Sequence, residues 1–262
     1  MTAVKATFCG SRARTGSDRH HTAEQELALF IPIRDENSLK SIPFQYVTVS
    51  LIIINVVVYM LEVGTLGQGA IASFAVVPKE LFDVGIFSGA APNATDVLAI
   101  SEGTTLITYM FFHADIFHLV GNMLFLWVFG DNVEDAMGHV RFLFFYLACG
   151  VAAALFHSWM LPNSQLPLIG ASGAVAGVIA AYLMLHPRVS VWVLAFKVIP
   201  LRITAGIVLG FWIALQVVMI ILADAGPTAW WAHIGGLIAG GVLIIFLRRP
   251  GVPLFDKGVQ VA

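Results

Sequence analysis

Two polar side chains in an otherwise apolar sequence have the residue types of a hydrolytic pair. Ser172 lies in the string Gly-Ala-Ser-Gly, and His233 follows an alanine near the start of another apolar run. A serine hydroxyl is a weak nucleophile until a neighbouring base takes its proton, and imidazole titrates near neutral pH. The pair therefore predicts nucleophilic catalysis with Ser172 as nucleophile and His233 as general base, provided that the fold brings them together.

A second polar group could stabilise the charge that such a reaction develops. His118 and Asn122 are four residues apart, so they share one face of a helix. A tetrahedral intermediate needs hydrogen-bond donors directed at its oxyanion, and both side chains and the Ser172 backbone N–H can donate. Asp115 is the expected N-cap of this helix, and His113 precedes it.

A metal site is the competing interpretation of these histidines. His113 and His118 are five residues apart, not the four that place two ligands on one helical face, and the sequence contains no H-E-x-x-H motif. We therefore predict no metal and no cofactor. Three further histidines are assigned structural places: His139, His157 and His186.

The composition predicts that lipid solvates most of the chain. Of the 262 residues, 58% are hydrophobic and 11% are charged, and the mean hydropathy is +0.86. A soluble domain carries about a quarter charged residues, so these few charges cannot cover a water-facing surface. The net charge of −2 and the absence of a basic patch predict no nucleic-acid partner.

The apolar runs predict an all-α membrane protein with six transmembrane helices. A span needs about 20 predominantly apolar residues. The connection between the first two spans, residues 62–115, is much longer than the others and is expected to form a long external loop. The expected spans are residues 44–61, 116–130, 140–161, 170–187, 203–223 and 230–247.

The basic residues predict the orientation of these spans. With a cytoplasmic N-terminus, thirteen of the fourteen Lys and Arg residues lie inside and only Lys79 lies outside. This divides the chain into a cytoplasmic N-terminal tail (1–42), a six-helix domain (43–249) and a cytoplasmic C-terminal tail (250–262). A bacterial cytoplasmic membrane is the expected location. Glu134 and Asp135 are expected to be solvated in a short cytoplasmic turn.

The same topology predicts that the polar groups converge. The second, fourth and sixth spans all run from outside to inside, so Ser172, His233, His118 and Asn122 should lie at one shallow depth. Small residues on facing helices allow close backbone approach in lipid, which a serine needs to reach a histidine on another helix. The small residues expected to provide this packing are Gly170, Gly173, Gly236 and Gly240.

These motifs, in this order, resemble the rhomboid family of intramembrane serine proteases. The resemblance implies a Ser172–His233 dyad without a carboxylate, oxyanion contacts from His118 and Asn122, and a supporting role for His113. It also implies single-span membrane proteins as substrates, cut near the outer membrane face through an acyl-enzyme. A non-catalytic rhomboid-like protein that binds membrane clients is the alternative, and a transporter or channel is a third hypothesis.

Overall fold

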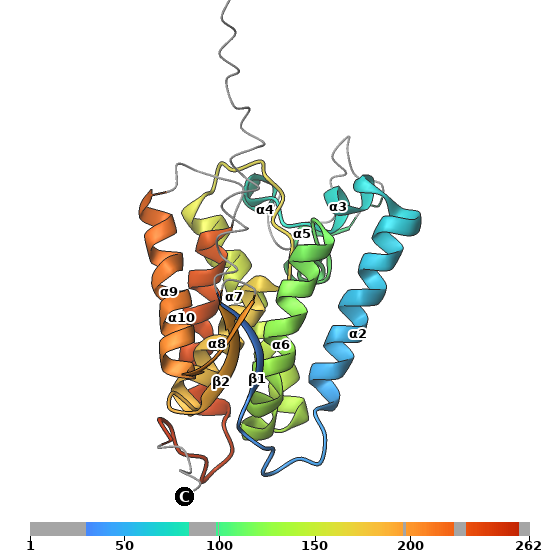
Figure 1. Ribbon diagram of the computed structural model, residues 1–262. Helices are drawn as coiled ribbons and strands as arrows, with labels where there is room; N and C mark the ends of the chain where they lie inside the picture. The colour runs from blue at the N-terminus through green and yellow to red at the C-terminus, as the bar shows by residue number, and fades with distance from the viewer. Residues whose placement is uncertain (1–29, 84–97, 99, 196–197, 223–228, 257–262) are drawn as a thin grey trace, which may run out of the picture.

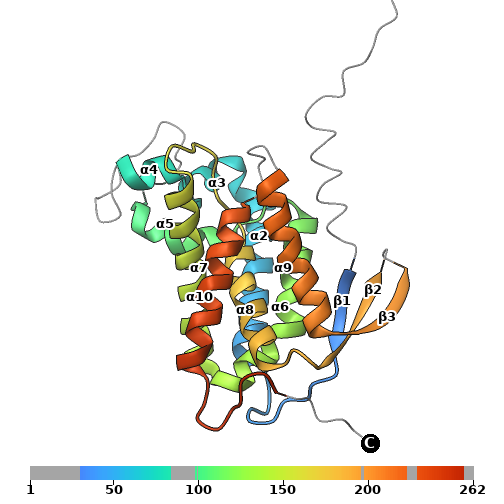
Figure 2. The same ribbon diagram turned by 90° about the vertical axis from the view of Figure 1, so that its left-hand side faces the viewer.

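The long helices of the computed structural model stand side by side, with short helices at one end and a small sheet on one flank (Figures 1 and 2). The structure describes residues 30–83, 98, 100–195, 198–222 and 229–256. Residues 1–29 of the predicted N-terminal tail and 257–262 of the predicted C-terminal tail lie outside the described residues. The elements are β1 (Phe30–Asp35), α2 (Tyr46–Leu61), η2 (Glu62–Leu66), α3 (Gln68–Phe74), α4 (Pro78–Asp83), α5 (Glu102–Thr108), η3 (Tyr109–Phe111), α6 (Ile116–Met137), α7 (His139–Met160), α8 (Ser172–Leu185), β2 (Ser190–Ala195), β3 (Ile199–Thr204), α9 (Ala205–Leu222) and α10 (Trp230–Leu247).

Within the described residues, four helices are long and apolar enough to cross a membrane: Tyr46–Thr65, Ile116–Met137, His139–Met160 and Trp230–Leu247. The regions of the expected fourth and fifth spans hold shorter apolar helices, α8 and α9. At 1.5 Å per residue, α8 is about 21 Å long, less than the roughly 30 Å of a bilayer's hydrocarbon core. The prediction of a helical membrane protein is confirmed, whereas the number of spans remains a prediction.

Helix α8 is surrounded by other helices of the protein. It packs against α6, α7, α9 and α10, and nearly all of its residues are buried. Its approach to α10 is especially close. A Cβ atom on Gly236 would lie 2.9 Å from the carbonyl carbon of Gly173 and closer still to the oxygen, and one on Gly240 would lie 2.5 Å from Cα of Gly177. Only glycine fits at these contacts, and they fix the start of α8 against the start of α10.

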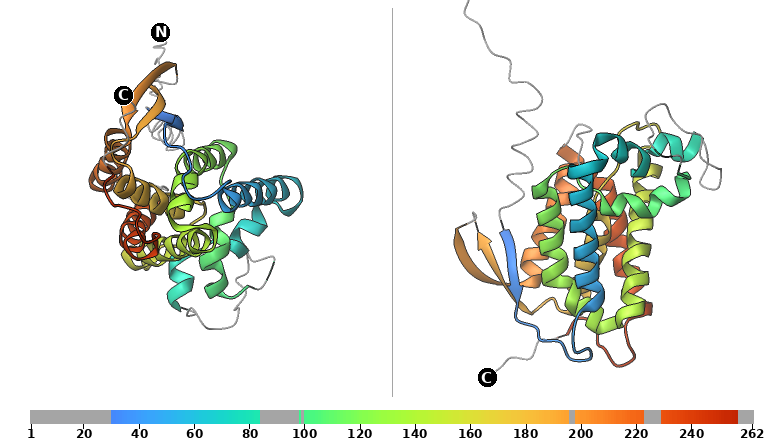
Figure 3. Two further views of the ribbon diagram at one scale, coloured as in Figure 1. Left: turned by 90° about the horizontal axis from the view of Figure 1, so that it is seen from below. Right: turned by 90° about the vertical axis from the view of Figure 1, so that its right-hand side faces the viewer.

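The connection between α2 and α6 holds the elements η2, α3, α4, α5 and η3. These short helices gather at one end of the bundle (Figure 3). A bridge between Val76 and Leu168 joins them to the connection between α7 and α8, and the rings of Phe74 and Phe112 stack at 4.9 Å.

The structure contains an antiparallel sheet of order β1-β2-β3, so the prediction of helices alone was wrong for these segments. β1 lies in the predicted N-terminal tail, β2 lies between the expected fourth and fifth spans, and β3 ends within the first two residues of the expected fifth span. Buried and half-buried residues alternate along β2, with Val191 and Val193 fully buried. The residue types do not alternate in the same way, because five of the six residues of β2 are apolar, so the strand was not visible in the sequence.

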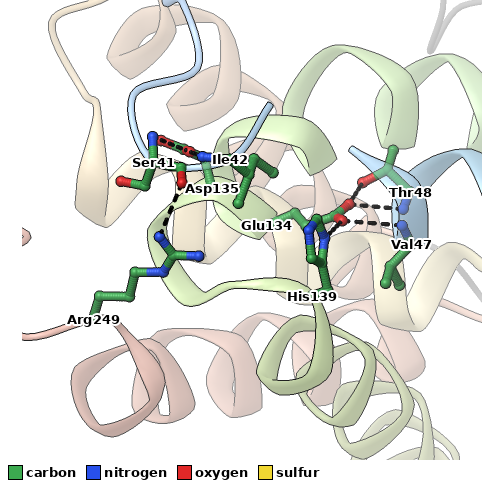
Figure 4. Close-up of polar contacts among 8 residues, drawn as sticks. All are labelled: Ser41, Ile42, Val47, Thr48, Glu134, Asp135, His139 and Arg249. Carbon is green, nitrogen blue, oxygen red and sulfur yellow. Dashed lines mark hydrogen bonds and ion pairs between the residues drawn. The ribbon is translucent and has the colours of Figure 1, made fainter. Parts of the chain in front are cut away.

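The carboxylates near the end of α6 are buried, so the expectation of a solvated turn was wrong. Glu134 is fully buried and accepts hydrogen bonds from the backbone N–H groups of Val47 (3.0 Å) and Thr48 (2.8 Å), and from the Thr48 hydroxyl (2.7 Å), as Figure 4 shows. The first N–H groups of a helix have no partner within that helix, and a carboxylate is favoured there. Glu134 therefore satisfies the start of α2.

Asp135 holds the segment before α2 in the same way. It accepts from the backbone N–H groups of Ser41 at 2.7 Å and Ile42 at 2.8 Å. Arg249, just after α10, donates to the carbonyl of Ser41 at 3.4 Å. These contacts fasten α2 and the segment before it to the end of α6 and to the residues after α10 (Figure 4).

Candidate active site

Ser172 and His233 lie in hydrogen-bond contact at the starts of α8 and α10. The distance between His233 Nε2 and Ser172 Oγ is 2.9 Å, across 61 residues of sequence. Ser172 is half-buried, and the His233 side chain is only 8% exposed. The glycine contacts between α8 and α10 begin at the residue after Ser172 and one turn after His233. The close backbones therefore set the distance between the two side chains.

A third residue, which the sequence analysis missed, contacts the other nitrogen of the His233 ring. Gln216 on α9 is fully buried, and its Oε1 lies 2.7 Å from His233 Nδ1. Its amide nitrogen donates to the carbonyl of Trp212, one turn earlier, at 3.4 Å. The available signal was a single amide in an otherwise apolar run, since a strongly polar residue inside a span is a functional hypothesis by default.

Two indole rings hold the imidazole of His233 from different sides. The ring of Trp212 lies 5.9 Å from that of His233 at an interplanar angle of 36°, and the ring of Trp230 lies 5.9 Å away at 88°. Aromatic contacts of this geometry favour a fixed ring orientation. The His233 ring is therefore held by packing as well as by hydrogen bonds.

His118 and Asn122 lie beside the turn that leads into Ser172. A Cβ atom on Gly170 would lie 2.6 Å from His118 Cε1 and 3.8 Å from Asn122 Nδ2, and Gly170 has a φ of +115°. Both steric space and backbone conformation therefore require glycine there. The predicted N-cap is confirmed, because the Asp115 carboxylate accepts from the backbone N–H groups of Phe117 and His118 at 2.7 and 2.9 Å.

The Asn122 amide is a buried donor without a partner among the described residues. Its side chain is 8% exposed, and Nδ2 makes no hydrogen bond there. Leaving such a group unpaired costs about 1–3 kcal/mol, so a buried donor of this kind beside Gly170 is available to bind an acceptor that is not part of the described structure.

His113 lies behind His118 rather than beside Ser172. Their rings are 5.1 Å apart in an edge-to-face arrangement, and the His113 side chain is fully buried. Burial lowers the pKa of His113 to about 3, so the ring is neutral at physiological pH. Its backbone N–H donates to Glu62 at 3.4 Å, which connects α6 to the end of α2.

The other histidines in the described part of the chain lie away from Ser172, and no metal cluster forms among the described residues. His139 contacts Glu134, His186 follows the far end of α8, and His157 is buried in α7. In the part of the chain that the structure describes, no group of three or more His, Cys, Asp or Glu residues gathers closely enough to hold a metal ion.

A family model described as "Rhomboid domain" matches residues 101–250, more than half of the 262 residues. The chain belongs to the rhomboid family. The match includes every residue of the site described above, from His113 to Gly240, so the predicted resemblance is confirmed at the level of the family.

Curated relatives give the same family. The chain is 28% identical over 161 residues to RHOMBOID-like protein 12, mitochondrial, of Arabidopsis thaliana. The aligned region covers 55% of this chain and 46% of that protein. It is 29% identical over 151 residues to Rhomboid protein 1, mitochondrial, of Saccharomyces cerevisiae, with 54% of this chain and 41% of that protein aligned. It is 32% identical over 153 residues to RHOMBOID-like protein 1 of Arabidopsis thaliana, with 58% of this chain and 36% of that protein aligned. The chain therefore spans less than half the length of each of these three proteins.

The names of these relatives bear on the predicted location. Two of the three are named as mitochondrial, which does not fit the prediction of a bacterial cytoplasmic membrane. The family and the apolar helices do support an integral membrane protein.

Proposed function

We propose that this rhomboid-family protein is an intramembrane serine endopeptidase that cleaves transmembrane segments of other proteins with a Ser172–His233 dyad. The observation that carries the proposal is the 2.9 Å contact between His233 Nε2 and Ser172 Oγ, made by two side chains on separate helices inside an apolar bundle. A hydroxyl within reach of a buried imidazole is the arrangement that activates a serine nucleophile.

The first step forms an acyl-enzyme. Ser172 Oγ attacks the carbonyl carbon of the scissile peptide bond while its proton passes to His233 Nε2, and the carbonyl π electrons move onto oxygen. The Asn122 amide, the His118 ring and the Ser172 backbone N–H are the proposed donors to this oxyanion. The N-terminal end of α8 adds a favourable dipole. When the intermediate collapses, the C–N bond breaks and His233 returns the proton to the leaving amine.

The second step releases the product. A water molecule attacks the ester carbonyl, gives a proton to His233 and forms a second tetrahedral intermediate. Collapse of this intermediate breaks the ester bond, returns the proton from His233 to Ser172 and frees the product as a carboxylic acid, which ionises to the carboxylate by losing its proton to water. No carboxylate partner for His233 is required in this scheme. Removing one oxyanion donor from a serine hydrolase costs on the order of 10²–10³-fold in kcat, so each proposed donor is testable.

The proposed membrane arrangement has six crossings in residues 43–249, both termini cytoplasmic and residues 62–115 at the outer face. The shared position of the starts of α6, α8 and α10 supports one shallow site near that face. The proposed substrates are single-span membrane proteins. A peptide bond within a helix is sterically shielded and its polar groups are internally hydrogen-bonded, so a substrate must unwind locally before Ser172 can attack.

The test is cleavage of a single-span reporter protein by the purified enzyme in proteoliposomes. Wild type, Ser172→Ala and His233→Ala are compared in the presence and absence of a chelator. The proposal predicts cleavage by wild type that is insensitive to the chelator and lost in both variants. Cleavage that survives in Ser172→Ala would exclude the proposed nucleophile. Binding of the reporter without cleavage by wild type would favour the client-binding alternative.

A further inference from the structure

Gln216 is the one strongly polar side chain that α9 brings to the dyad. The hydrogen bond between its Oε1 and His233 Nδ1 is 2.7 Å long, shorter than the contact between His233 and Ser172. We propose that Gln216 is a positioning residue, which holds the His233 proton on Nδ1 and so keeps Nε2 free to accept the proton of Ser172. This inference rests on the proposed function and extends it to a third residue.

Gln216 contacts both the carbonyl of Trp212 and Nδ1 of His233, and the carbonyl indicates which group is the donor in each hydrogen bond. The carbonyl of Trp212 can only accept, so the orientation that places the Gln216 NH₂ group toward it, at 3.4 Å, is favoured over the one that would bring two oxygens together. The oxygen of the amide then faces His233. Since that oxygen can only accept, Nδ1 of His233 must carry the proton that is shared with it.

This assignment decides whether His233 can act as a base. A neutral imidazole carries one proton, so a proton on Nδ1 leaves a lone pair on Nε2. That lone pair is 2.9 Å from the Ser172 oxygen. With the proton on Nε2 instead, the ring would donate to Ser172 and could not take its proton. The hydrogen bond made by one ring nitrogen thus sets the chemistry of the other.

Burial leaves Gln216 as the main hydrogen-bond partner of His233 Nδ1. Gln216 is fully buried, and His233 is 8% exposed, so little water can replace the amide as a partner for Nδ1. A buried polar group costs free energy unless it is hydrogen-bonded, and a buried charge costs more. A neutral amide therefore orients the ring without placing a second charge in the apolar bundle.

A purely structural role is the rival explanation, because polar side chains also join helices within a membrane. The two roles predict different measurements. A structural contact between α9 and α10 would change the stability of the protein or its affinity for substrate. A positioning role changes kcat and the location of the imidazole proton.

The direct test is ¹⁵N NMR of histidine-labelled protein, at a pH where the ring is neutral, with the His233 signals identified from their loss in His233→Ala. We expect Nδ1 to be protonated and Nε2 unprotonated in wild type. A protonated Nε2 in wild type would overturn the inference whatever any variant does, so the test does not depend on a variant that folds.

Kinetics of three α9 variants complete the test. Gln216→Leu keeps the size of the side chain but removes the acceptor, and we expect kcat to fall about 10- to 100-fold with KM nearly unchanged. Gln216→Glu retains an acceptor oxygen and is expected to keep more activity than Gln216→Leu. Val217→Leu, at an exposed neighbouring position, is the matched control and should leave kcat unchanged.

The outcomes separate this inference from the proposed function. Cleavage that persists in Ser172→Ala would overturn the proposed function itself. Cleavage that depends on Ser172, together with an unchanged kcat and an unchanged proton position in Gln216→Leu, would overturn only the role of Gln216. A fall in kcat with a loss of the Nδ1–H signal in the same variant would support it.

Discussion

The glycine contact between α8 and α10 gives the sharpest prediction about how the fold controls the site. In Gly236→Ala, the added Cβ would lie 2.9 Å from the carbonyl carbon of Gly173 and nearer to its oxygen, whereas ordinary contact begins at 3.4 Å. The distance from this Cβ to the carbonyl carbon must therefore increase by at least 0.5 Å, and the distance to the oxygen by more. The carbonyl carbon and oxygen of Gly173 belong to the backbone, so they cannot rotate away as a flexible side chain would. The two helices must therefore separate by on the order of 1 Å.

This separation acts directly on the dyad. Ser172 precedes Gly173 and His233 lies one turn before Gly236, so the 2.9 Å contact would lengthen beyond the roughly 3.2 Å at which hydrogen bonds are normally found. A misplacement of about 1 Å can cost about 10²-fold in rate. Overpacking typically costs about 1–3 kcal/mol of stability. We therefore expect a folded protein, with lower thermal stability and about 100-fold slower cleavage.

The assay is the initial rate of reporter cleavage in proteoliposomes, with thermal unfolding in detergent measured on the same preparations. Gly241→Ala is the matched control, since a Cβ there meets only the Met184 sulfur at 3.6 Å. It places the same methyl group on the same helix and should leave both rate and stability nearly unchanged. Full activity and stability in Gly236→Ala, or equal damage in Gly241→Ala, would refute the argument.

Three other predictions follow from the described contacts. Asn122→Ala should lower kcat on the order of 10²-fold with little change in KM, because it removes an oxyanion donor; a change in KM alone, measured in the same cleavage assay, would contradict that role. Glu134→Leu should lower the free energy of unfolding by about 1–3 kcal/mol without moving Ser172, because the N–H groups of Val47 and Thr48 lose their acceptor; unfolding in detergent measures this, and unchanged stability would refute it. Burial raises the pKa of Asp35 from 3.8 to about 6, so the folded state binds this proton more tightly than the unfolded state. Its contribution to stability should therefore rise as pH falls from about 7 towards 4. Melting temperatures across this range should depend less on pH in Asp35→Asn, and an identical dependence in both proteins would contradict the assignment.

The convergence of the polar residues could be predicted from sequence because it follows from the expected alternation of the spans. Alternating spans place the starts of the second, fourth and sixth at one face, whatever the details of packing. The small residues around Gly173 and Gly236 then indicated which two helices approach most closely. In the structure Ser172 and His233 are in contact, and His118 lies beside Gly170.

Other features were missed because they depend on partners distant in sequence. Gln216 has no motif around it, and its importance lies in a histidine on the next helix. Glu134 and Asp135 looked like surface charges because they follow an apolar run, yet they are buried by the start of α2 and the segment before it. The sheet was missed because β1 pairs with a strand more than 150 residues later. None of these pairings produces a local sequence pattern.

Covalent labelling shows whether Ser172 is a nucleophile activated by His233. Purified protein in detergent is treated with a fluorophosphonate, and the modified residue is located by mass spectrometry of peptides. We expect one adduct, on Ser172, which forms rapidly in wild type and is lost or strongly slowed in His233→Ala. An adduct on another residue, or equal labelling of Ser172 with and without His233, would exclude the proposed dyad.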